Sequence, residues 1–539
     1  MTSLYSRICI ALAMALSLAA CSKGETDADI GVQDGILLTG NGVEPRTLDP
    51  QLNTGSPDGR IIAVLSEGLV TSDPIDPYGV LPGVAQSWEH DDEYRQWTFH
   101  LRPGAMWSDG SPLTAQDFLY SFRRILTPAL GAELAELFYG IKGAEDFNKG
   151  KTDDFSTVGF SSPDPQTLVI TADAPMPHLL NMLATYTFYP VQKAAVEANG
   201  KMTDRNNDWF EQGSYVGNGP FILDEWKTNQ YISVKKNPNY WDAANVRLNG
   251  IRFFAIENQK SELNAYLSGQ LHMTNTGSVP VERIASLRKS HPDELRTDHQ
   301  PNANFYAFNT GRKAFSDKRV RKALSLALDR KLLTERVLLG GETPAGGLAP
   351  LGLPGYDAMP APKADPAAAR RLLAQAGYPG GKGFPKLDIL INTLEKNRKL
   401  AEAIQAMWKK ELGIDVGIYN QEWKVFLDTR KARDFDVTRS GWFGFYPGPG
   451  AYLTLMTTDS PNNDSGWSNP RYDALVAEAL ATGDTTKRMN LFHQAEAILI
   501  DEMPILPLYY GAQNTMVDTR VKNWGSDGAG NFKFVYLEE

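Results

Sequence analysis

Cysteine is nearly absent from the 539-residue sequence, which contains only Cys9 and Cys21. Two thiols cannot build a disulfide framework, and they are too few for a site with three or four cysteine ligands. The seven histidines lack the i, i+4 pairing that places two imidazoles on one helical face, and no HExxH or CxxC motif occurs. The sequence therefore predicts no metal site and no cofactor.

Positive charge and long apolar runs are also scarce. Lys and Arg number 54 against 64 Asp and Glu, so the formal net charge is −10. An acidic chain lacks the basic stripe that nucleic acids require and does not adhere broadly to anionic lipid. No stretch approaches the about 18 continuous apolar residues of a membrane-spanning helix. We expect a water-soluble body that binds no nucleic acid.

Catalytic motifs are missing as well. There is no GxSxG, and residues 377–382 (GYPGGK) have neither the spacing nor the Ser or Thr of a phosphate loop. Ser286 and Lys289 match S-x-x-K, but no S-D-N companion follows at a plausible place. These absences favour a binding protein, with an enzyme as the weaker alternative.

The length and the local patterns indicate several α/β domains. A mass of 59.5 kDa exceeds one hydrophobic core, since cores stop growing near about 250–300 residues. Residues 95–102 alternate like a strand with Trp97, Phe99 and Leu101 on one face, and residues 167–171 are rich in β-formers. The 11 Trp, 21 Tyr and 23 Phe suit a large core or an aromatic-walled ligand cavity.

Helix start and stop signals divide the second half of the chain. Thr114 and Asp117 have capping-box spacing, and Ser316 can cap a helix that keeps helical spacing from Val320 to Leu332. Further predictions are a helix from Asp365-Pro366 to Gly377, a helix 397–412 closed by Gly413, a strand 414–419, and loops at 340–362 and 447–450. Helix-then-strand order is typical of an α/β lobe.

The N-terminus has the plan of a secretory signal: Arg7, an apolar run at 8–16, and small residues. Residues 18–21 (LAAC) resemble a bacterial lipobox, which implies cleavage before Cys21 and attachment of diacylglycerol to it. We predict a signal peptide at 1–20 and a lipidated cysteine with a flexible tether at 21–39. The alternative is an ordinary signal peptide. The body is expected on the extracytoplasmic face. Ser22 after the lipidated cysteine would permit sorting to the outer membrane, whereas docking on a permease requires the inner membrane, so the choice between the two membranes is left open.

An ordered series of phrases carries the most specific information. The phrases are Glu44–Pro50, Glu67–Leu69, Leu81–Trp88, Trp97–Arg102, Trp107–Phe118, Asn218–Pro220, Asn239–Trp241, Asp317–Ala323 and Asn420–Lys424. Taken together, they resemble the extracytoplasmic oligopeptide- and dipeptide-binding proteins that serve ABC importers, from about Gly40 to near the C-terminus.

This resemblance implies an α/β fold: a bilobed periplasmic-binding-protein clamp of type II, cluster C, with an extra small domain and a hinge between the lobes. The expected domains are lobe I (40–66, 190–300 and 508–539), the extra domain (67–189) and lobe II (301–507). It further implies a monomeric, lipid-anchored substrate-binding subunit that captures peptides and delivers them to a permease with its ATPase subunits. The alternative is a scavenger, sensor or chaperone for a non-peptide or end-blocked ligand.

In this family the ligand backbone adds as a strand between the lobes, beside a segment that reads RSGWFGFY at 439–446 here. The resemblance implies contacts from loop, helix and strand positions in both lobes. The expected ligand-binding residues are Thr54, Gly55, Asn392, Asn397, Trp423, Arg430, Arg439, Gly441, Trp442, Phe443, Phe445 and Tyr509.

Several charged anchors of the family are replaced. Phe445 stands where relatives carry the aspartate that pairs with the peptide ammonium, and Thr54 replaces an acidic residue. At the positions where relatives carry the histidine and the lysine that bind the peptide carboxylate, this sequence has Asn397 and Leu338. Burying an ammonium without a carboxylate is costly. We hypothesise that the ligand lacks a free buried N-terminal ammonium.

Overall fold

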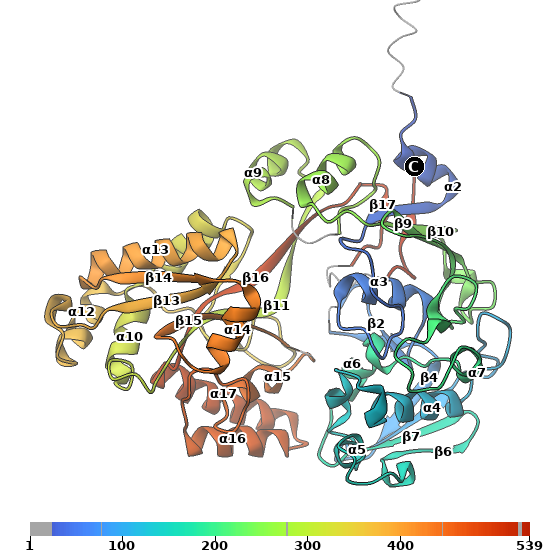
Figure 1. Ribbon diagram of the computed structural model, residues 1–539, viewed down its shortest axis with the longest axis horizontal. Helices are drawn as coiled ribbons and strands as arrows, with labels where there is room; N and C mark the ends of the chain where they lie inside the picture. Colours follow the sequence, from blue (N-terminus) through green and yellow to red (C-terminus); the bar gives the residue numbers. More distant parts are fainter. Residues whose placement is uncertain (1–23, 77, 276–278, 445, 526–530) are drawn as a thin grey trace, which may run out of the picture.

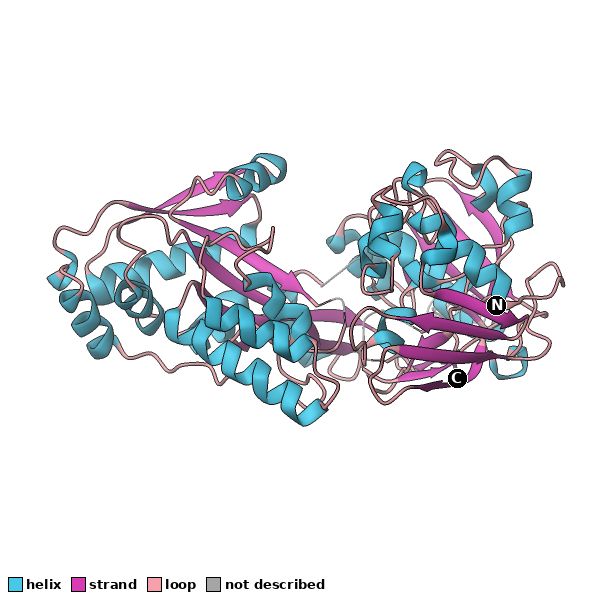
Figure 2. Ribbon diagram, turned by 90° about the horizontal axis from the view of Figure 1, so that it is seen from below, coloured by secondary structure: helices cyan, strands magenta, loops and turns pink. Residues whose placement is uncertain are grey.

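The computed structural model describes residues 24–76, 78–275, 279–444, 446–525 and 531–539. Two bodies lie side by side and are joined by the long strands β11 (Leu295–Phe308) and β16 (Ile505–Met516), as Figure 1 shows. Seen from below in Figure 2, the same two bodies are again separate, with strands passing between them. The arrangement is the predicted bilobed α/β clamp.

Lobe I is built around a four-stranded sheet of order β1-β10-β9-β8, in which β1 and β10 are parallel. Its core includes Leu37, Ile61, Phe221 and Phe253. The strands are β1 (Ile36–Gly40), β8 (Phe221–Lys227), β9 (Tyr231–Lys236), β10 (Gly250–Phe254), β17 (Val521–Lys522) and β18 (Tyr536–Leu537). The helices are α2 (Asp27–Asp34), α3 (Ser56–Leu65), α7 (Lys193–Ala198), α8 (Gln259–Leu267) and α9 (Val281–Ser290).

The extra domain continues the right-hand body downward in Figure 1 around a sheet of order β4-β5-β7-β6. The predicted alternating strand is confirmed, since Trp97, Phe99 and Leu101 of β5 are buried in its core. Thr114 and Asp117 form the predicted capping box of α4. The elements are β2 (Val70–Ser72), β3 (Val80–Pro82), β4 (Ala85–His90), β5 (Gln96–Leu101), β6 (Phe160–Asp164), β7 (Thr167–Thr171), α4 (Ala115–Leu126), α5 (Ala144–Asn148) and α6 (Leu179–Leu183).

Lobe II contains a six-stranded mixed sheet of order β12-β16-β11-β15-β13-β14. Helices α10, α12 and α13 pack on one face of this sheet, and α15, α16 and α17 pack on the other. The strands, besides β11 and β16, are β12 (Thr343–Pro344), β13 (Leu387–Asn392), β14 (Val416–Gln421) and β15 (Val437–Phe443). The helices are α10 (Lys318–Leu326), α11 (Arg330–Leu332), α12 (Pro366–Gln375), α13 (Glu395–Leu412), α14 (Trp423–Lys431), α15 (Gly450–Leu453), α16 (Pro470–Leu480) and α17 (Thr485–Glu502).

The link between the bodies is an irregular antiparallel ribbon. Residues Leu295–His299 of β11 pair with Ala512–Met516 of β16, and Ala303–Ala307 pair with Ile505–Tyr510. The register shifts between His299 and Ala303, around Pro301, which has no N–H to donate to the ladder. A two-stranded ribbon interrupted at this point is the hinge that joins the lobes.

One predicted helix is shorter than expected and begins at another residue. The side chain of Asp317, not Ser316, accepts the N–H of Arg319, and α10 ends at Leu326. Asp329 caps the next turn, so the pattern from Val320 to Leu332 spans two helices. Ser316 and Asp317 are both good capping residues, and the sequence does not distinguish them.

The flexible tether predicted for 21–39 is also wrong in its second part. Thr26 and Asp29 form a capping box at the start of α2, and Arg520 Nη1 donates to Asp29 Oδ1 at 2.7 Å. Strand β1 then pairs with β10. An acidic composition alone indicates a flexible segment. Here, however, the Asp29 carboxylate forms part of a helix cap and pairs with Arg520. Cys21 lies outside the described residues.

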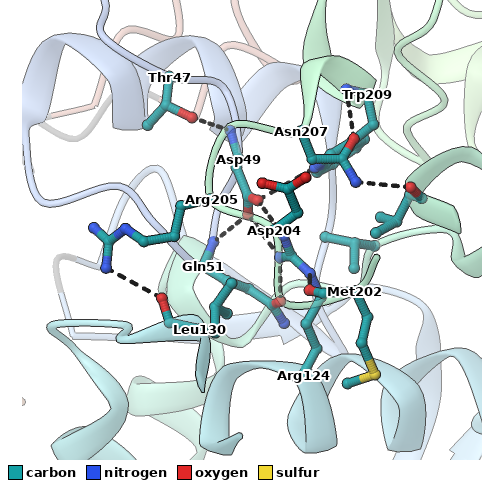
Figure 3. Close-up of polar contacts among 12 residues, drawn as sticks. Thr47, Asp49, Gln51, Arg124, Leu130, Met202, Asp204, Arg205, Asn207 and Trp209 are labelled. Carbon is teal, nitrogen blue, oxygen red and sulfur yellow. Dashed lines mark hydrogen bonds and ion pairs between the residues drawn. The ribbon is translucent and has the colours of Figure 1, made fainter. Parts of the chain in front are cut away.

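A fully buried ion pair ties lobe I to the extra domain (Figure 3). Arg124 Nη2 on α4 donates to Asp49 Oδ2 at 2.7 Å, and the two side chains are 0% and 1% exposed. Trp209 Nε1 donates to the same carboxylate at 3.2 Å, and Gln51 Oε1 accepts from Arg124 at 2.7 Å. The Leu-Asp-Pro phrase around Asp49 is therefore an anchor of the scaffold.

Arg124→Met should destabilise the protein by about 3–5 kcal/mol, because it leaves the Asp49 carboxylate buried without a cation. Urea unfolding checks this. The matched control is Lys151→Met, which breaks an ion pair with Asp146 whose side chains are 63% and 58% exposed and should cost less than about 1 kcal/mol. Equal losses in the two variants would contradict the assignment.

Candidate ligand-binding site

Strand β15 sets the two faces of the candidate site. Arg439 lies opposite Tyr306, and Gly441 lies opposite Asn304, which in turn faces Tyr509 on β16. Because successive side chains of a strand point to opposite faces, Arg439, Gly441 and Tyr509 share one face of the sheet. The structure thus brings together three predicted residues from two distant parts of the sequence.

Trp442 points to the opposite face, where it packs against the core around α15–α17. Its Nε1 donates to the carbonyl of Ala451 at 2.6 Å, which fixes the ring against α15. Phe443 ends the strand with 51% of its surface exposed. Trp442 therefore braces the site, whereas Phe443 offers open aromatic surface. Phe445 lies outside the described residues.

Arg439 is the most informative side chain of the set. It is partly buried beside Tyr306 and Tyr509, and burial lowers the pKa of its guanidinium. Among the described residues no carboxylate pairs with it. The hydroxyl of Tyr306 is likewise buried without a hydrogen-bond partner in the described chain. A cation and a hydroxyl in this state can each form a hydrogen bond with a negatively charged or carbonyl oxygen.

Arg430 and Trp423 occupy the ends of α14. Arg430 Nη2 lies 2.6 Å from Asp464 Oδ2, so its charge is already neutralised by a carboxylate. Trp423 stacks on Phe426 with ring centroids 5.7 Å apart and remains 48% exposed. Of these two predicted contacts, the tryptophan retains free surface, and the arginine ties α14 to the loop that precedes α16.

Asn397 and Asn392 pair with each other. Asn397 is 3% exposed, and its Nδ2 donates to Asn392 Oδ1 at 2.8 Å. The preceding residue, Lys396, instead places its ammonium 5.0 Å from the ring centroid of Tyr509 and 2.7 Å from Glu342 Oε1. The pairing of Lys396 with Glu342 could not be predicted from the sequence, because the two residues are 54 positions apart and match no motif.

Thr54 and Gly55 lie in lobe I, where they lead into α3. Thr54 is exposed, with its hydroxyl 3.5 Å from Arg46 Nη2, and the N–H of Gly55 donates to Asn53 Oδ1 at 2.6 Å. Within the described chain, no hydrogen bond or ion pair joins Thr54 or Gly55 to the predicted site residues of lobe II. Thr54 and Gly55 therefore belong to the other lobe of the clamp.

A second contact between the bodies lies just after the candidate strand. His178 of the extra domain stacks on Tyr446 of lobe II, with ring centroids 3.9 Å apart and planes inclined by 18°. The rings border a cavity of about 280 Å³ that Pro177, Pro447 and Arg488 also line. Burial lowers the pKa of His178 to about 4, and the nearby Arg488 adds to this effect.

The described residues contain neither a metal-ion cluster nor a membrane-spanning helix. No cluster of three or more His, Cys, Asp or Glu side chains there has a geometry suited to a metal ion. The described helices also include none that is long and apolar enough to cross a membrane.

Comparisons with known proteins agree with this geometry. The sequence profile of the bacterial extracellular solute-binding proteins, family 5, matches residues 79–464. The periplasmic murein peptide-binding protein MppA of Escherichia coli is 38% identical over 490 residues, covering 89% of this chain and 88% of MppA. The probable deoxycholate-binding periplasmic protein YgiS of the same organism is 35% identical over 478 residues, covering 87% of each chain.

Solved structures share the fold of this chain over nearly its whole length. The unliganded open form of the murein tripeptide-binding protein MppA superimposes with a TM-score of 0.82 at 36% identity. The match covers 94% of this chain and 98% of that one.

The His178–Tyr446 contact should make stability depend on pH. With a folded pKa of about 4, below the usual 6.5, this group's stabilisation is complete above about pH 6.5 and is lost as the pH falls toward 4. His178→Phe keeps a stacked ring but removes the proton site. Between pH 7 and 4.5 the free energy of unfolding in urea should fall about 1–3 kcal/mol less in this variant. Parallel pH profiles would refute the contribution of His178.

Proposed function

This chain belongs to the bacterial extracellular solute-binding proteins of family 5, and we propose that its lobes close on a peptide or peptide-like ligand that carries one carboxylate and no buried ammonium. Family membership rests on a profile match over more than half of the chain and on relatives that align over nearly its whole length. It is a substrate-binding protein of an ABC importer, acting on the extracytoplasmic side and delivering its ligand to a permease.

The unpaired guanidinium of Arg439 carries the proposal. Its neighbours Tyr306 and Tyr509 supply hydroxyl groups but no negative charge. A ligand carboxylate would therefore gain a charge-assisted hydrogen bond at this point of the sheet. At the position of the family's amine-binding aspartate the sequence has Phe445. The set of charges thus favours a ligand with an anion at Arg439 and without a free amine at the other end.

A second candidate is an amphipathic non-peptide carboxylate. Trp423 and Leu427 are 48% and 38% exposed and lie on one face of α14, and Phe443 is 51% exposed. Exposed apolar surface of this kind marks a binding site more often than an ordinary surface. YgiS, a relative over most of the chain, is described as probably binding deoxycholate, which is a rigid apolar carboxylate. The same Arg439 would accept its single anion.

The anchor and the domain boundaries complete the proposal. Lipid at Cys21 would hold the body at the membrane through the few residues that precede Thr26, where α2 begins its capping box. Lobe I is taken as 40–66, 190–300 and 508–539, the extra domain as 67–189, and lobe II as 301–507. The limit between residues 300 and 301 is supported by the interruption of the β11–β16 ribbon between His299 and Ala303. The protein is expected to act as a monomer.

Isothermal titration with matched tripeptides tests the charge requirement. N-acetylated tripeptides with a free carboxyl end should bind more tightly than the same peptides with a free amine. Arg439→Gln should weaken the acetylated acid roughly 10- to 100-fold, because a charge-assisted bond is lost.

The control is Arg398→Gln, whose exposed guanidinium pairs with Glu395 and Glu402 on α13 and should leave affinity unchanged. A free tripeptide bound at micromolar affinity or better, with its ammonium sequestered, would rule out the proposed ligand chemistry. Binding of a bile acid and of no tripeptide would favour the second candidate.

Cys21→Ser should release the protein from the membrane, because a signal peptide cleaved without lipid leaves no anchor. Fractionation of the native host, followed by mass spectrometry of the N-terminal peptide, measures both effects. The wild-type peptide should begin at a diacylglyceryl-modified Cys21. An unmodified N-terminus in the soluble fraction of the wild type would show an ordinary signal peptide.

A further inference from the structure

Lys396 and Glu342 form an ion pair next to the Arg439 face. Lys396 Nζ lies 2.7 Å from Glu342 Oε1 and 5.0 Å from the ring centroid of Tyr509. The pKa of Lys396 is raised: burial opposes the charge, but Tyr509 and Glu342 outweigh it. Tyr509 also interacts electrostatically with Arg439, so the charges of both cations act on this tyrosine. Only one of them, Lys396, has a carboxylate partner in the described chain.

The backbone around Glu342 fixes its carboxylate in place. Its side chain is 3% exposed, and its Oε2 accepts the N–H of Gly340 at 2.8 Å. A Cβ on Gly340 would lie 2.9 Å from that carboxylate, and Gly341 has a φ of +89°, so both positions favour glycine. The carbonyl of Gly340 in turn accepts Asn514 Nδ2 at 2.6 Å. The carboxylate is therefore held rigidly at the ammonium.

The pair faces a cavity of about 680 Å³ between the two lobes. Lobe II lines it with Leu338, Glu342 and Lys396, and lobe I with Lys260 and Val279. The side chain of Lys396 is 40% exposed and lines the cavity. Its positive charge is neutralised by the carboxylate of Glu342, whose side chain is only 3% exposed. A ligand lying along the Arg439 face and extending into this cavity would meet Lys396.

From this geometry we infer that Glu342 is a built-in counter-ion that keeps Lys396 from binding ligand, and so restricts the cleft to ligands with a single carboxylate. A second ligand anion near Lys396 would meet the fixed Glu342 charge and be repelled. Glu342 thereby acts as a specificity-determining residue, through Lys396, without being required to touch the ligand. This inference rests on the proposed function, in which Arg439 receives the first carboxylate.

The first test compares Glu342→Gln with the wild type. The glutamine amide oxygen still accepts the Gly340 N–H, so the loop is retained, but the negative charge is gone. Titrations use N-acetyl tripeptide acids in matched pairs that differ by Gln against Glu at one position, scanned over the three positions. The wild type should prefer the monoacid at every position. In the variant the diacid should gain about tenfold at the position nearest Lys396.

Two controls separate specificity from a structural effect. Glu395→Gln removes another carboxylate that lines the cavity but is 59% exposed and pairs with Arg398, and it should leave the preference unchanged. Adding Lys396→Met to Glu342→Gln should abolish the diacid gain. An unchanged preference in Glu342→Gln, or a wild type that prefers the diacid, would overturn the inference.

A ligand-independent readout covers the case in which no tripeptide binds. Lysines are ¹³C-methylated, the Lys396 resonance is assigned with Lys396→Arg, and butyrate is titrated in. The resonance should stay constant in the wild type and move with saturation in Glu342→Gln. This result without any peptide binding would refute the peptide ligand and leave the role of Glu342 standing. A wild-type resonance that saturates with butyrate, or a variant resonance that does not respond, would refute the role itself.

Discussion

The antiparallel pairing of β11 with β16 is the constraint on which the rest of the structure depends. These strands cross from one body to the other, and each contributes pairs on both sides of the register shift between His299 and Ala303. On the lobe II side, the same strands are neighbouring interior strands of the six-stranded sheet. Any rotation of the lobes must therefore be absorbed near Pro301, where the ladder is interrupted.

The candidate site is built on this ribbon. Strand β15, which carries Arg439 and Gly441, pairs along β11 from Asn302 to Phe308, immediately after the interruption. Tyr509 belongs to β16 itself. A ligand held by these residues thus sits where small rotations of the hinge bring lobe I against it. The His178–Tyr446 stack adds a second point at which the bodies meet, and it follows directly after the same strand.

Features set by short-range patterns could be predicted from the sequence. The alternation of Trp97, Phe99 and Leu101 and the Thr114–Asp117 capping box depend on residues a few positions apart, and both are present in the structure. The choice between Ser316 and Asp317 as a cap was not predictable, since both residues offer a suitable oxygen. The N-terminal segment is predicted to be flexible from its polar, acidic composition. The sequence does not show that Asp29 pairs with Arg520, because the two residues are 491 positions apart.

The candidate site was likewise only partly predictable from the sequence. The family phrases located Arg439, Gly441 and Tyr509, which the sheet register places on one face. They did not show that Asn397 pairs with Asn392, or that Lys396 and Glu342 take up the neighbouring space. These relations arise from the packing of α13 against a loop after α11, and such packing leaves no periodic trace in the sequence. The sequence shows which residues carry a charge, whereas the ion pairs that these residues form depend on the folded structure.

We propose that the cleft selects a ligand with one carboxylate and no amine. Native mass spectrometry of the protein purified from its own host, with the bound ligand ejected, derivatised and fragmented, measures both groups. The bound ligand should form one methyl ester and should not react with an amine reagent. A ligand that carries a free amino group, such as an unmodified tripeptide, would contradict it.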